Sequence, residues 1–446
     1  MKSVDKNLSP ASPAPDGDDL AEFLDRRERI SGALGDRAAL ILPAAPQLRF
    51  GRDGELRYRP DPELYYLTGW RDAGAVAVID PTDSEAPYRL FVAPRDPEVE
   101  RWHGPGVGPE EAGGVFGADA TLPLDELESH LAKAFGRLDR AYYRMGVGEG
   151  TDRAVLAGLA RNRKARQRGG VGLRAVADPG HLLDPLRRVK SVREVERIRR
   201  AARVTAEAFE EARLAIRPGA GEWQVQAPLE AGFRSRGAAG PAFETIVAGG
   251  ANAVVLHYTR NSARLADGEF VLIDAGAQLD LYAADVTRTW AVGGALGGAA
   301  AEMHEIVVRA QRAAITACRP GESEQSVHDA ALAVLLEGAA ALGLLPEERA
   351  TGGDAAEHRD IIPHRTSHWL GLEVHDVGDY ATPSGPVPLE PGMVLTVEPG
   401  LYVPLDHPTA PPELRGVGVR IEDDALITEA GADVLTAALD RAAGGD

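Results

Sequence analysis

The architecture of the chain is decided by residues 191–219, S-V-R-E-V-E-R-I-R-R-A-A-R-V-T-A-E-A-F-E-E-A-R-L-A-I-R-P-G. Ser191 and Glu194 stand at the S-x-x-E spacing of a capping box, which marks the start of a helix. Apolar residues then recur at three- and four-residue steps along one face. The Pro-Gly pair at 218–219 ends this helix, and a second helix is expected to start at Glu222.

The same R-P-G triplet returns at 319–321. It again follows a helical run, which starts at Glu302, and another helical run follows it from Glu324. Strand-rich stretches come after each helix pair, at 243–292 and at 361–428. The order helix, R-P-G, helix and strands therefore occurs twice. We predict a C-terminal region built from two internally duplicated α/β halves.

The region 20–185 has a different pattern, in which short apolar runs alternate with turn signals. The runs at 75–80 and 89–94 are bounded by Pro and Asp and predict strands, and 124–135 has the pattern of an amphipathic helix. This alternation is typical of an α/β domain. The domain is expected to end in the Pro-, Gly- and Asp-rich link at 178–185.

Composition restricts the possible partners of the chain. Its 446 residues include 49 Lys and Arg against 68 Asp and Glu, for a net charge of −19. Such an acidic chain repels nucleic acid and anionic lipid surfaces, so we expect neither as a partner. The basic run at 161–168 is interpreted as a solvated surface because no aromatic residue interleaves it. No apolar stretch approaches the about 18 residues that a membrane-spanning helix needs.

The ends of the chain and its single cysteine indicate where the protein works. Residues 1–19 lack the apolar segment of a signal peptide and are predicted to be a disordered Pro/Ser/Asp tail. Cys318 has no second cysteine to pair with, and it lies at the end of a helical pattern, where a small buried residue is usual. We expect a cytoplasmic protein whose C-terminal domain spans 186–446.

Three carboxylates stand at or near the ends of strand patterns. The run F-V-L-I-D-A-G at 270–276 carries Asp274 at its end, and Asp285 follows 11 residues later. Two such carboxylates on adjacent strands can face one another, although a lone strand-end aspartate more often caps a turn. A third apolar run carries Glu398 directly before a Pro-Gly turn.

The segment G-V-G-V-R-I-E-D-D-A-L-I-T at 416–428 alternates in the manner of a half-buried strand. Its valines and isoleucine form one face, and Arg420 and Glu422 lie on the other. Two interpretations of that second face remain open at this point. It either lines a polar pocket or is an outer, solvated face.

Histidines gather in H-R-T-S-H-W-L-G-L-E-V-H-D at 364–376. The four-residue spacing of His364 and His368 suits one face of a helix. The zinc-protease helix H-E-x-x-H, however, requires Glu where Arg365 stands, so that site is not predicted. A single histidine is more often structural than a ligand, but three in twelve positions favour a functional site.

Five of these residues together predict a metal centre. They are Asp274, Asp285, His368, Glu398 and Glu422. Four carboxylates beside an imidazole repel one another unless cations are present, and two divalent ions would neutralise them. The mostly oxygen ligands favour Mn(II), Co(II) or Fe(II) over tetrahedral zinc. Two ions about 3.5–4 Å apart can activate a bridging water at neutral pH.

At these residues the chain resembles the Xaa-Pro aminopeptidases, which belong to the pita-bread metallopeptidases. The resemblance rests on the motifs L-H-Y-T-R-N, L-I-D-A-G, D-V-T-R-T-W, S-H-W-L-G-L-E-V-H-D, L-T-V-E-P-G-L-Y and G-V-R-I-E-D-D. In the N-terminal half, Y-R-P-D-P-E-L-Y-Y-L-T-G-W and L-F-V-A-P-R-D-P-E-V-E-R-W-H-G resemble the family's non-catalytic domain. The resemblance covers roughly 20–440. It implies an N-terminal α/β domain at 20–185 and a pita-bread catalytic domain, which would explain the duplication.

The resemblance also implies a role for each ligand. Asp274 would bind one metal, His368 and Glu398 the second, and Asp285 and Glu422 would bridge both. The ions are expected to be two Mn(II). A hydroxide between them would attack the scissile carbonyl, and Glu398 would accept the proton of the water that supplies it. The reaction would remove the N-terminal residue from peptides with proline in second position.

Further residues would act on the substrate. His257, His364 and His375 would line the substrate site and stabilise the tetrahedral intermediate, and Arg420 would sit near the metals and the proline subsite.

Tyr258 would contact the substrate as well. Trp102 matches a tryptophan that family members lend to a neighbouring subunit's site, and Arg166 matches a comparable arginine, so a homodimer or homotetramer is expected. Arg365 departs from the smaller residues of many relatives and is bulky enough to alter the substrate pocket.

Three other functions compete with this interpretation. A prolidase has the same metals but cuts Xaa-Pro dipeptides, and the S-H-W-L-G-L-E-V-H-D segment favours the aminopeptidase. A creatinase would have some of the ligands replaced. A non-catalytic pita-bread module that binds histones or RNA would have lost ligands and would often carry charged tails, whereas all five ligands are present here and there is no basic arm.

Overall fold

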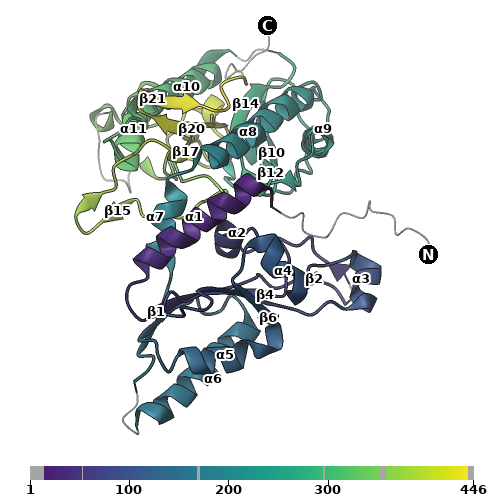
Figure 1. Cartoon of the computed structure of the whole chain (residues 1–446). Helices are drawn as coiled ribbons and strands as arrows, with labels where there is room; N and C mark the ends of the chain where they lie inside the picture. The colour runs from purple at the N-terminus through teal and green to yellow at the C-terminus, as the bar shows by residue number, and fades with distance from the viewer. Residues whose placement is uncertain (1–14, 53, 168–170, 295–296, 351–357, 440–446) are drawn as a thin grey trace. The chain divides into compact units, whose positions relative to one another are not determined.

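The structure, a computed structural model, describes residues 15–52, 54–167, 171–294, 297–350 and 358–439. The chain forms two compact units, Met1–Leu183 and Asp184–Asp446, and each is described by itself. The elements of both are labelled in Figure 1. Among the described residues, no helix combines the length and apolar character needed to cross a membrane.

The first unit is built on a six-stranded mixed sheet with the order β6-β5-β4-β1-β7-β8. β4 pairs antiparallel with both β1 and β5, whereas β5–β6, β1–β7 and β7–β8 are parallel. Every residue of β1 and β4 is buried, as expected for central strands covered on both faces. The strands are β1 (Ala38–Pro43), β4 (Ala75–Ile79), β5 (Tyr88–Val92), β6 (Ala120–Pro123), β7 (Arg140–Tyr142) and β8 (Ala175–Ala177).

Helices complete this unit, and α5 and α6 run side by side along one face of the sheet (Figure 1). Leu127 and Leu131 of α5 and Val155 of α6 bury their side chains against Ile41 and Phe91 of the sheet. The helices are α1 (Gly17–Ala33), α2 (Pro62–Thr68), α3 (Pro97–His103), α4 (Pro109–Phe116), α5 (Leu127–Ala134) and α6 (Glu149–Arg166). A short hairpin joins β2 (Arg49–Phe50) to β3 (Gly54–Glu55).

Two boundaries differ from the sequence-based expectation. The tail predicted over 1–19 is too long, because α1 begins at Gly17; Asp16 caps it by accepting a hydrogen bond from the Asp19 amide at 2.7 Å. Residues 1–14 lie outside the described residues. The link predicted at 178–185 is largely helical, since α7 spans Gly180–Arg188 and contains Pro185. Pro185 lies inside this helix, beyond the first turn that ordinarily accommodates proline.

The second unit repeats one arrangement. In its first half, α8 and α9 pack together and the strands form the antiparallel sheet β10-β11-β14. In its second half, α10 and α11 pack together and the sheet is β17-β20-β21. The elements are α8 (Val192–Arg213), α9 (Glu222–Ser235), β10 (Ile246–Gly249), β11 (Phe270–Ala275), β14 (Val286–Ala291), α10 (Gly298–Ala317), α11 (Glu324–Ala341), β17 (Val394–Val397), β20 (Asp423–Thr428) and β21 (Gly431–Val434).

The repeated triplet occupies the same structural position in both halves. The Gly219 amide donates to the Leu265 carbonyl at 2.8 Å, and the Gly321 amide donates to the Leu389 carbonyl at 2.9 Å. Both glycines have positive φ, 81° and 88°, which a side chain would disfavour. The mixed α/β fold and the duplicated halves predicted from the sequence are therefore both present.

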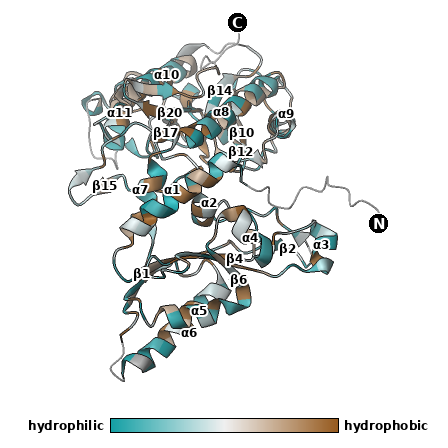
Figure 2. Ribbon diagram, in the orientation of Figure 1, coloured by the Kyte–Doolittle hydropathy of each residue, from teal (hydrophilic) through white to brown (hydrophobic). Residues whose placement is uncertain are grey.

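Apolar side chains from the helices and from the sheet of each half form its core. In the second half Trp369 is fully buried beside residues of α10 and α11, and Cys318, at the C-terminal end of α10, is buried with them. Figure 2 shows hydrophobic colour on β17 and β20 and hydrophilic colour on parts of the surrounding helices. Two short strands of the second half, β18 (Gly400–Tyr402) and β19 (Gly418–Arg420), pair antiparallel.

Candidate metal centre

Strand ends deliver four carboxylates to one place. Asp274 is the penultimate residue of β11, and Asp285 comes directly before β14. Glu398 follows β17, and Glu422 lies between β19 and β20. Because β17 pairs with β20 so that Val397 stands opposite Asp423, both glutamates emerge at the same end of that sheet. The antiparallel pairing of the strands thus brings together carboxylates that lie far apart in the chain.

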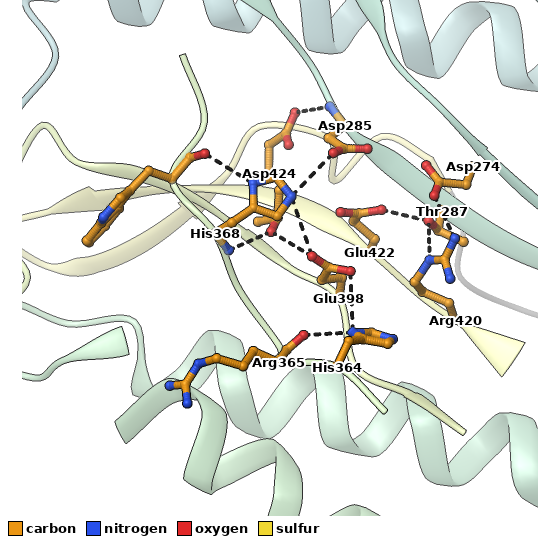
Figure 3. A network of polar contacts seen from close by, with 12 residues as sticks. Asp274, Asp285, Thr287, His364, Arg365, His368, Glu398, Arg420, Glu422 and Asp424 are labelled. Carbon is orange, nitrogen blue, oxygen red and sulfur yellow. Dashed lines mark hydrogen bonds and ion pairs between the residues drawn. The ribbon is translucent and has the colours of Figure 1, made fainter. Parts of the chain in front are cut away.

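His368 lies among these carboxylates (Figure 3). Its Nε2 is 3.5 Å from Asp285 Oδ2 and 3.4 Å from Glu398 Oε1. One ligand atom from each of Asp285, His368 and Glu422 lies within 4.8 Å of the others, as a metal-binding group requires. The segment 364–368 forms no helix, consistent with the rejection of an H-E-x-x-H site.

The surroundings of His368 fit a cation between its ring and the carboxylates. Its Nδ1 lies 3.1 Å from the Trp369 carbonyl, which can only accept, so Nδ1 carries the proton. Its Nε2 faces two carboxylates, and a metal ion would bind all three groups at this place. A carbonyl behind the imidazole is the usual partner of a metal-ligating histidine.

Electrostatics point to the same conclusion. Burial, together with the charges of Glu422 and Asp274, raises the pKa of Asp285 well above its ordinary value. Burial, together with Glu398 and Asp274, likewise raises the pKa of Glu422. Asp274 Oδ1 and Asp285 Oδ1 are buried without a hydrogen-bond partner in the described part of the chain. Carboxylates in this state fit divalent cations, which compensate the charge and occupy the free oxygens.

Arg420 connects the metal centre to its surroundings. It donates to Asp274 Oδ2 at 2.6 Å and to the Tyr402 hydroxyl at 2.8 Å. Its Nε donates to Thr287, whose hydroxyl donates to Glu422 at 2.6 Å. Burial opposes its charge, but Tyr402 and the nearby carboxylates raise the pKa of Arg420 well above its ordinary value, so it stays cationic.

The comparisons with known proteins agree with this geometry. The model of metallopeptidase family M24 matches residues 196–429, and the model of the aminopeptidase P N-terminal domain matches residues 23–143. Over 425 residues the chain is 35% identical to Xaa-Pro aminopeptidase of Escherichia coli, covering 94% of this chain and 95% of that protein. The chain belongs to the Xaa-Pro aminopeptidases of metallopeptidase family M24.

Solved structures share the whole fold of this family member. Pseudomonas aeruginosa aminopeptidase PepP is 37% identical with a TM-score of 0.88, covering 95% of this chain and 96% of that one. Zn-substituted Escherichia coli aminopeptidase P in complex with product is 35% identical with a TM-score of 0.87, covering 95% and 96%. The predicted family, enzyme class and fold are confirmed, and the family establishes a divalent metal cofactor.

The three histidines predicted to line the substrate site, His257, His364 and His375, differ in their exposure and in their contacts. The His375 ring is 4.3 Å from the ring of His368, measured between centroids. His257 is exposed on the loop after β10, close enough that its charge acts on His375. Burial first, and then His368, lowers the pKa of His375, so His375 is neutral at pH 7.

His364 is held by two partners. Its Nδ1 donates to the Arg365 carbonyl at 2.7 Å, and its Nε2 accepts from the Tyr402 hydroxyl at 2.8 Å. The Arg365 side chain points away from the carboxylates (Figure 3). It donates instead to Glu324 at 3.0 and 2.5 Å. This side chain therefore lies away from the metal centre, and its expected effect on the substrate pocket stays a prediction.

Not every predicted site residue joins the cluster. Trp102 on α3, with 82% of its surface exposed, and Arg166 at the end of α6 both belong to the first unit. The Tyr258 hydroxyl donates to Glu222 at 2.9 Å, away from the five ligands. For the face that carries Arg420 and Glu422, the solvated interpretation is wrong, since 4% and 2% of their surfaces are exposed.

Sequence reasoning missed several residues around the centre. Tyr402 joins Arg420 to His364, and its place in the L-T-V-E-P-G-L-Y motif was the available signal. Asp424 accepts a hydrogen bond from the Asp285 amide at 3.2 Å, and burial raises its pKa well above the ordinary value. It follows Glu422 by two residues, at the same phase of a strand, where a further inward carboxylate could have been expected.

Proposed function

We propose that the protein is a dinuclear-metal aminopeptidase that removes the N-terminal residue from peptides with proline in second position. The observation that carries this proposal is the cluster of four carboxylates around His368, whose Nε2 faces Asp285 and Glu398. The prolidase alternative shares this cluster and differs in the length of peptide that it accepts.

The residues present fit two divalent ions. Asp274 would hold one ion, His368 and Glu398 the other, and Asp285 and Glu422 both. Oxygen ligands outnumber nitrogen, which favours Mn(II). When bound, two such ions make a water acidic enough to attack a carbonyl at neutral pH.

The chain's own groups then assist the reaction. Glu398 is placed beside His368 to accept a proton from the attacking water, and Arg420 keeps Asp274 oriented through a 2.6 Å hydrogen bond. The neutral imidazole of His375 donates an N–H to the developing oxyanion, together with His257. His364 lines the substrate site, with both of its ring nitrogens already oriented by Arg365 and Tyr402.

Proline in second position imposes a particular demand on the site. The Xaa-Pro bond is a tertiary amide without an N–H, and the ring sets φ of the proline. Recognition must therefore rely on the fit of the ring and on the free amino terminus, and the trans isomer, which dominates in peptides, is the form expected to bind. Carboxylates of the cluster attract the amino terminus, which limits removal to one residue.

The test compares three peptides on the Mn(II)-loaded protein. We expect an Xaa-Pro peptide extended by two residues to be cleaved faster than the Xaa-Pro dipeptide, with the matching Xaa-Ala peptide nearly inert. Cleavage confined to the dipeptide would identify a prolidase. Rapid cleavage of the Xaa-Ala peptide would remove the proline specificity altogether.

Trp102 and Arg166 are proposed to serve the substrate site of a neighbouring subunit in a homodimer or homotetramer. The 82% exposed indole of Trp102 is the supporting observation. Replacing Trp102 by alanine should raise KM while light scattering still reports the same oligomer. A monomeric wild-type protein with full activity would contradict the proposal. A cytoplasmic location stays a prediction.

A further inference from the structure

The internal duplication extends three residues beyond the R-P-G triplet, to a glutamate. The two segments read R-P-G-A-G-E at 217–222 and R-P-G-E-S-E at 319–324. Glu222 is the first residue of α9 and Glu324 the first residue of α11. Only 0% of the surface of Glu222 and 3% of that of Glu324 is exposed. Such burial is unusual for a glutamate at the start of a helix.

The backbone around the two glutamates is also equivalent. Gly221 forms an isolated antiparallel bridge with Arg264, and Ser323 forms one with Pro388. These bridges continue the matching hydrogen bonds that Gly219 and Gly321 make in the two halves. Glu222 and Glu324 therefore occupy the same site of the repeated fold.

Helix capping does not account for either glutamate. At the start of α9, the Gly221 amide donates to the Gln224 side chain at 2.8 Å. At the start of α11, Ser323 and Ser326 complete a capping box. Both helix ends are thus served by other residues, and the carboxylates of Glu222 and Glu324 are directed elsewhere.

Glu222 organises the segment that carries His257. Its Oε1 accepts from the Gly249 amide and from Asn252 Nδ2, each at 2.9 Å. Its Oε2 accepts from the Tyr258 hydroxyl at 2.9 Å and from the Ala263 amide at 2.7 Å. Four donors that lie on both sides of His257 thus converge on one buried carboxylate.

Glu324 organises the segment that carries His364. It accepts two hydrogen bonds from the Arg365 guanidinium, at 3.0 and 2.5 Å. A bidentate pair of this kind restricts the arginine geometrically. The carbonyl of the same arginine accepts from His364 Nδ1 at 2.7 Å and so sets the ring's tautomer. Glu324, Arg365 and His364 form one continuous path.

We propose that Glu222 and Glu324 are equivalent positioning residues, one in each half, which hold the segments carrying His257 and His364. Each acts through its histidine and touches neither the substrate nor a metal. The inference rests on the proposed function, because it assumes that both histidines act on the peptide. It also gives the departure at Arg365 a purpose, since that side chain supplies the link between Glu324 and the backbone of the site.

Double-mutant cycles on the Mn(II)-loaded, full-length protein test this inference. Glu324→Ala alone should lower kcat by about 10- to 100-fold, the cost of a misplaced catalytic group. In a His364→Ala background the same change should alter kcat less than about 2-fold, because nothing remains to be positioned. Glu222→Ala should behave in the same way with His257→Ala. The crossed pairs, Glu324→Ala with His257→Ala and Glu222→Ala with His364→Ala, should be additive.

Two measurements and a control variant accompany the cycles. Elemental analysis should show unchanged metal content, and a thermal melt should show a folded protein in each variant. Glu337→Ala is the matched control, because Glu337 is an exposed glutamate of α11. Its kcat should equal that of the wild type. If Glu222→Ala fails to fold, Asn252→Ala removes one of the four hydrogen bonds and enters the same cycle.

The outcomes separate this inference from the function on which it rests. Wild-type kcat in both His→Ala variants would overturn the proposed roles of the histidines. Loss of kcat in those variants, with equal additivity in matched and crossed cycles, would overturn the positioning role alone. Loss of metal in Glu222→Ala or Glu324→Ala would also overturn it, since the glutamates would then support the metal centre instead.

Discussion

The two halves of the second unit share a backbone plan but contribute differently to chemistry. The Gly268 amide donates to the Val292 carbonyl at 3.1 Å, as the Gly392 amide does to the Ile427 carbonyl at 2.9 Å. Asp274 and Glu398 each lie six residues after one of these glycines, at equivalent strand ends. Duplication thus placed two carboxylates symmetrically about the centre.

The second half then diverged further. It supplies His364, His368 and His375 from one irregular segment, Arg420 from the end of β19, and Glu422 from the residues between β19 and β20. The first half supplies two aspartates and the exposed His257. The repeated scaffold therefore sets where carboxylates emerge, whereas the histidines and the arginine of the site differ between the two halves. Four predictions test this division.

The largest effect is expected at a bridging position. Glu422→Gln should lose at least one of two bound ions and almost all activity, because it removes a charge that balances the cations. Without metal the same change should raise the melting temperature, since burial and neighbouring carboxylates raise the pKa of Glu422 and disfavour its charge. Elemental analysis checks the loss of bound metal, and thermal melts with and without Mn(II) check the change in melting temperature. Full activity with trace metal in the wild type would contradict the dinuclear centre.

The next effect concerns the buried ion pair that joins the two halves of the second unit. Arg288 of β14 donates to Asp423 Oδ1 at 2.8 Å and to the Glu422 carbonyl at 2.6 Å, and both side chains are fully buried. Arg288→Met leaves a buried charge without its main partner and should cost about 3–5 kcal/mol of unfolding free energy. The control is Arg200→Met, which breaks the exposed pair with Asp280 and should cost less than about 1 kcal/mol. Equal losses in urea titrations would refute the comparison.

The histidines should separate by role. His257→Ala and His375→Ala are each expected to lower kcat by about 10²–10³-fold, typical of losing a transition-state donor, with metal content near wild type. His368→Ala should instead release metal. A metal-free His257 or His375 variant would mean that this residue is a ligand.

The smallest effect is a difference in acid sensitivity between the halves. Burial lowers the pKa of His328 on α11 to about 4, whereas α8 and α9 contain no histidine. Between pH 6.5 and 4 the unfolded chain binds a proton that folded His328 does not, so stability falls as pH falls through this window. Metal-free hydrogen exchange should show α11 losing protection before α9 on acidification. His328→Gln should reduce that difference, and an unchanged difference would exclude His328 as its cause.

Local patterns were sufficient for most elements. The S-x-x-E spacing located the start of α8, with its capping box, and the Pro-Gly pairs located the ends of helices in both halves. The starts of α9 and α11 were predicted at Glu222 and Glu324, where the structure has them. These features depend on contacts within a few residues, which a sequence displays directly.

The same local reasoning failed at the two boundaries of the first unit. The start of α1 depends on the Asp16 cap, which is hidden in a stretch whose composition is typical of a disordered tail. Pro185 suggested a break, but α7 continues through it to Arg188. Composition averages over such single contacts, and it therefore missed the helical residues in both stretches.

By itself the sequence determined the duplication, the family and the five candidate ligands, because strand ends and motif spacings are written along the chain. Tertiary structure alone decided which way the side chains point. Arg365 turns toward Glu324, and Tyr402 joins Arg420 to His364. These partners stand 18 to 41 residues apart. Their geometry depends on how the sheets register, and no pattern in a single segment contains that information.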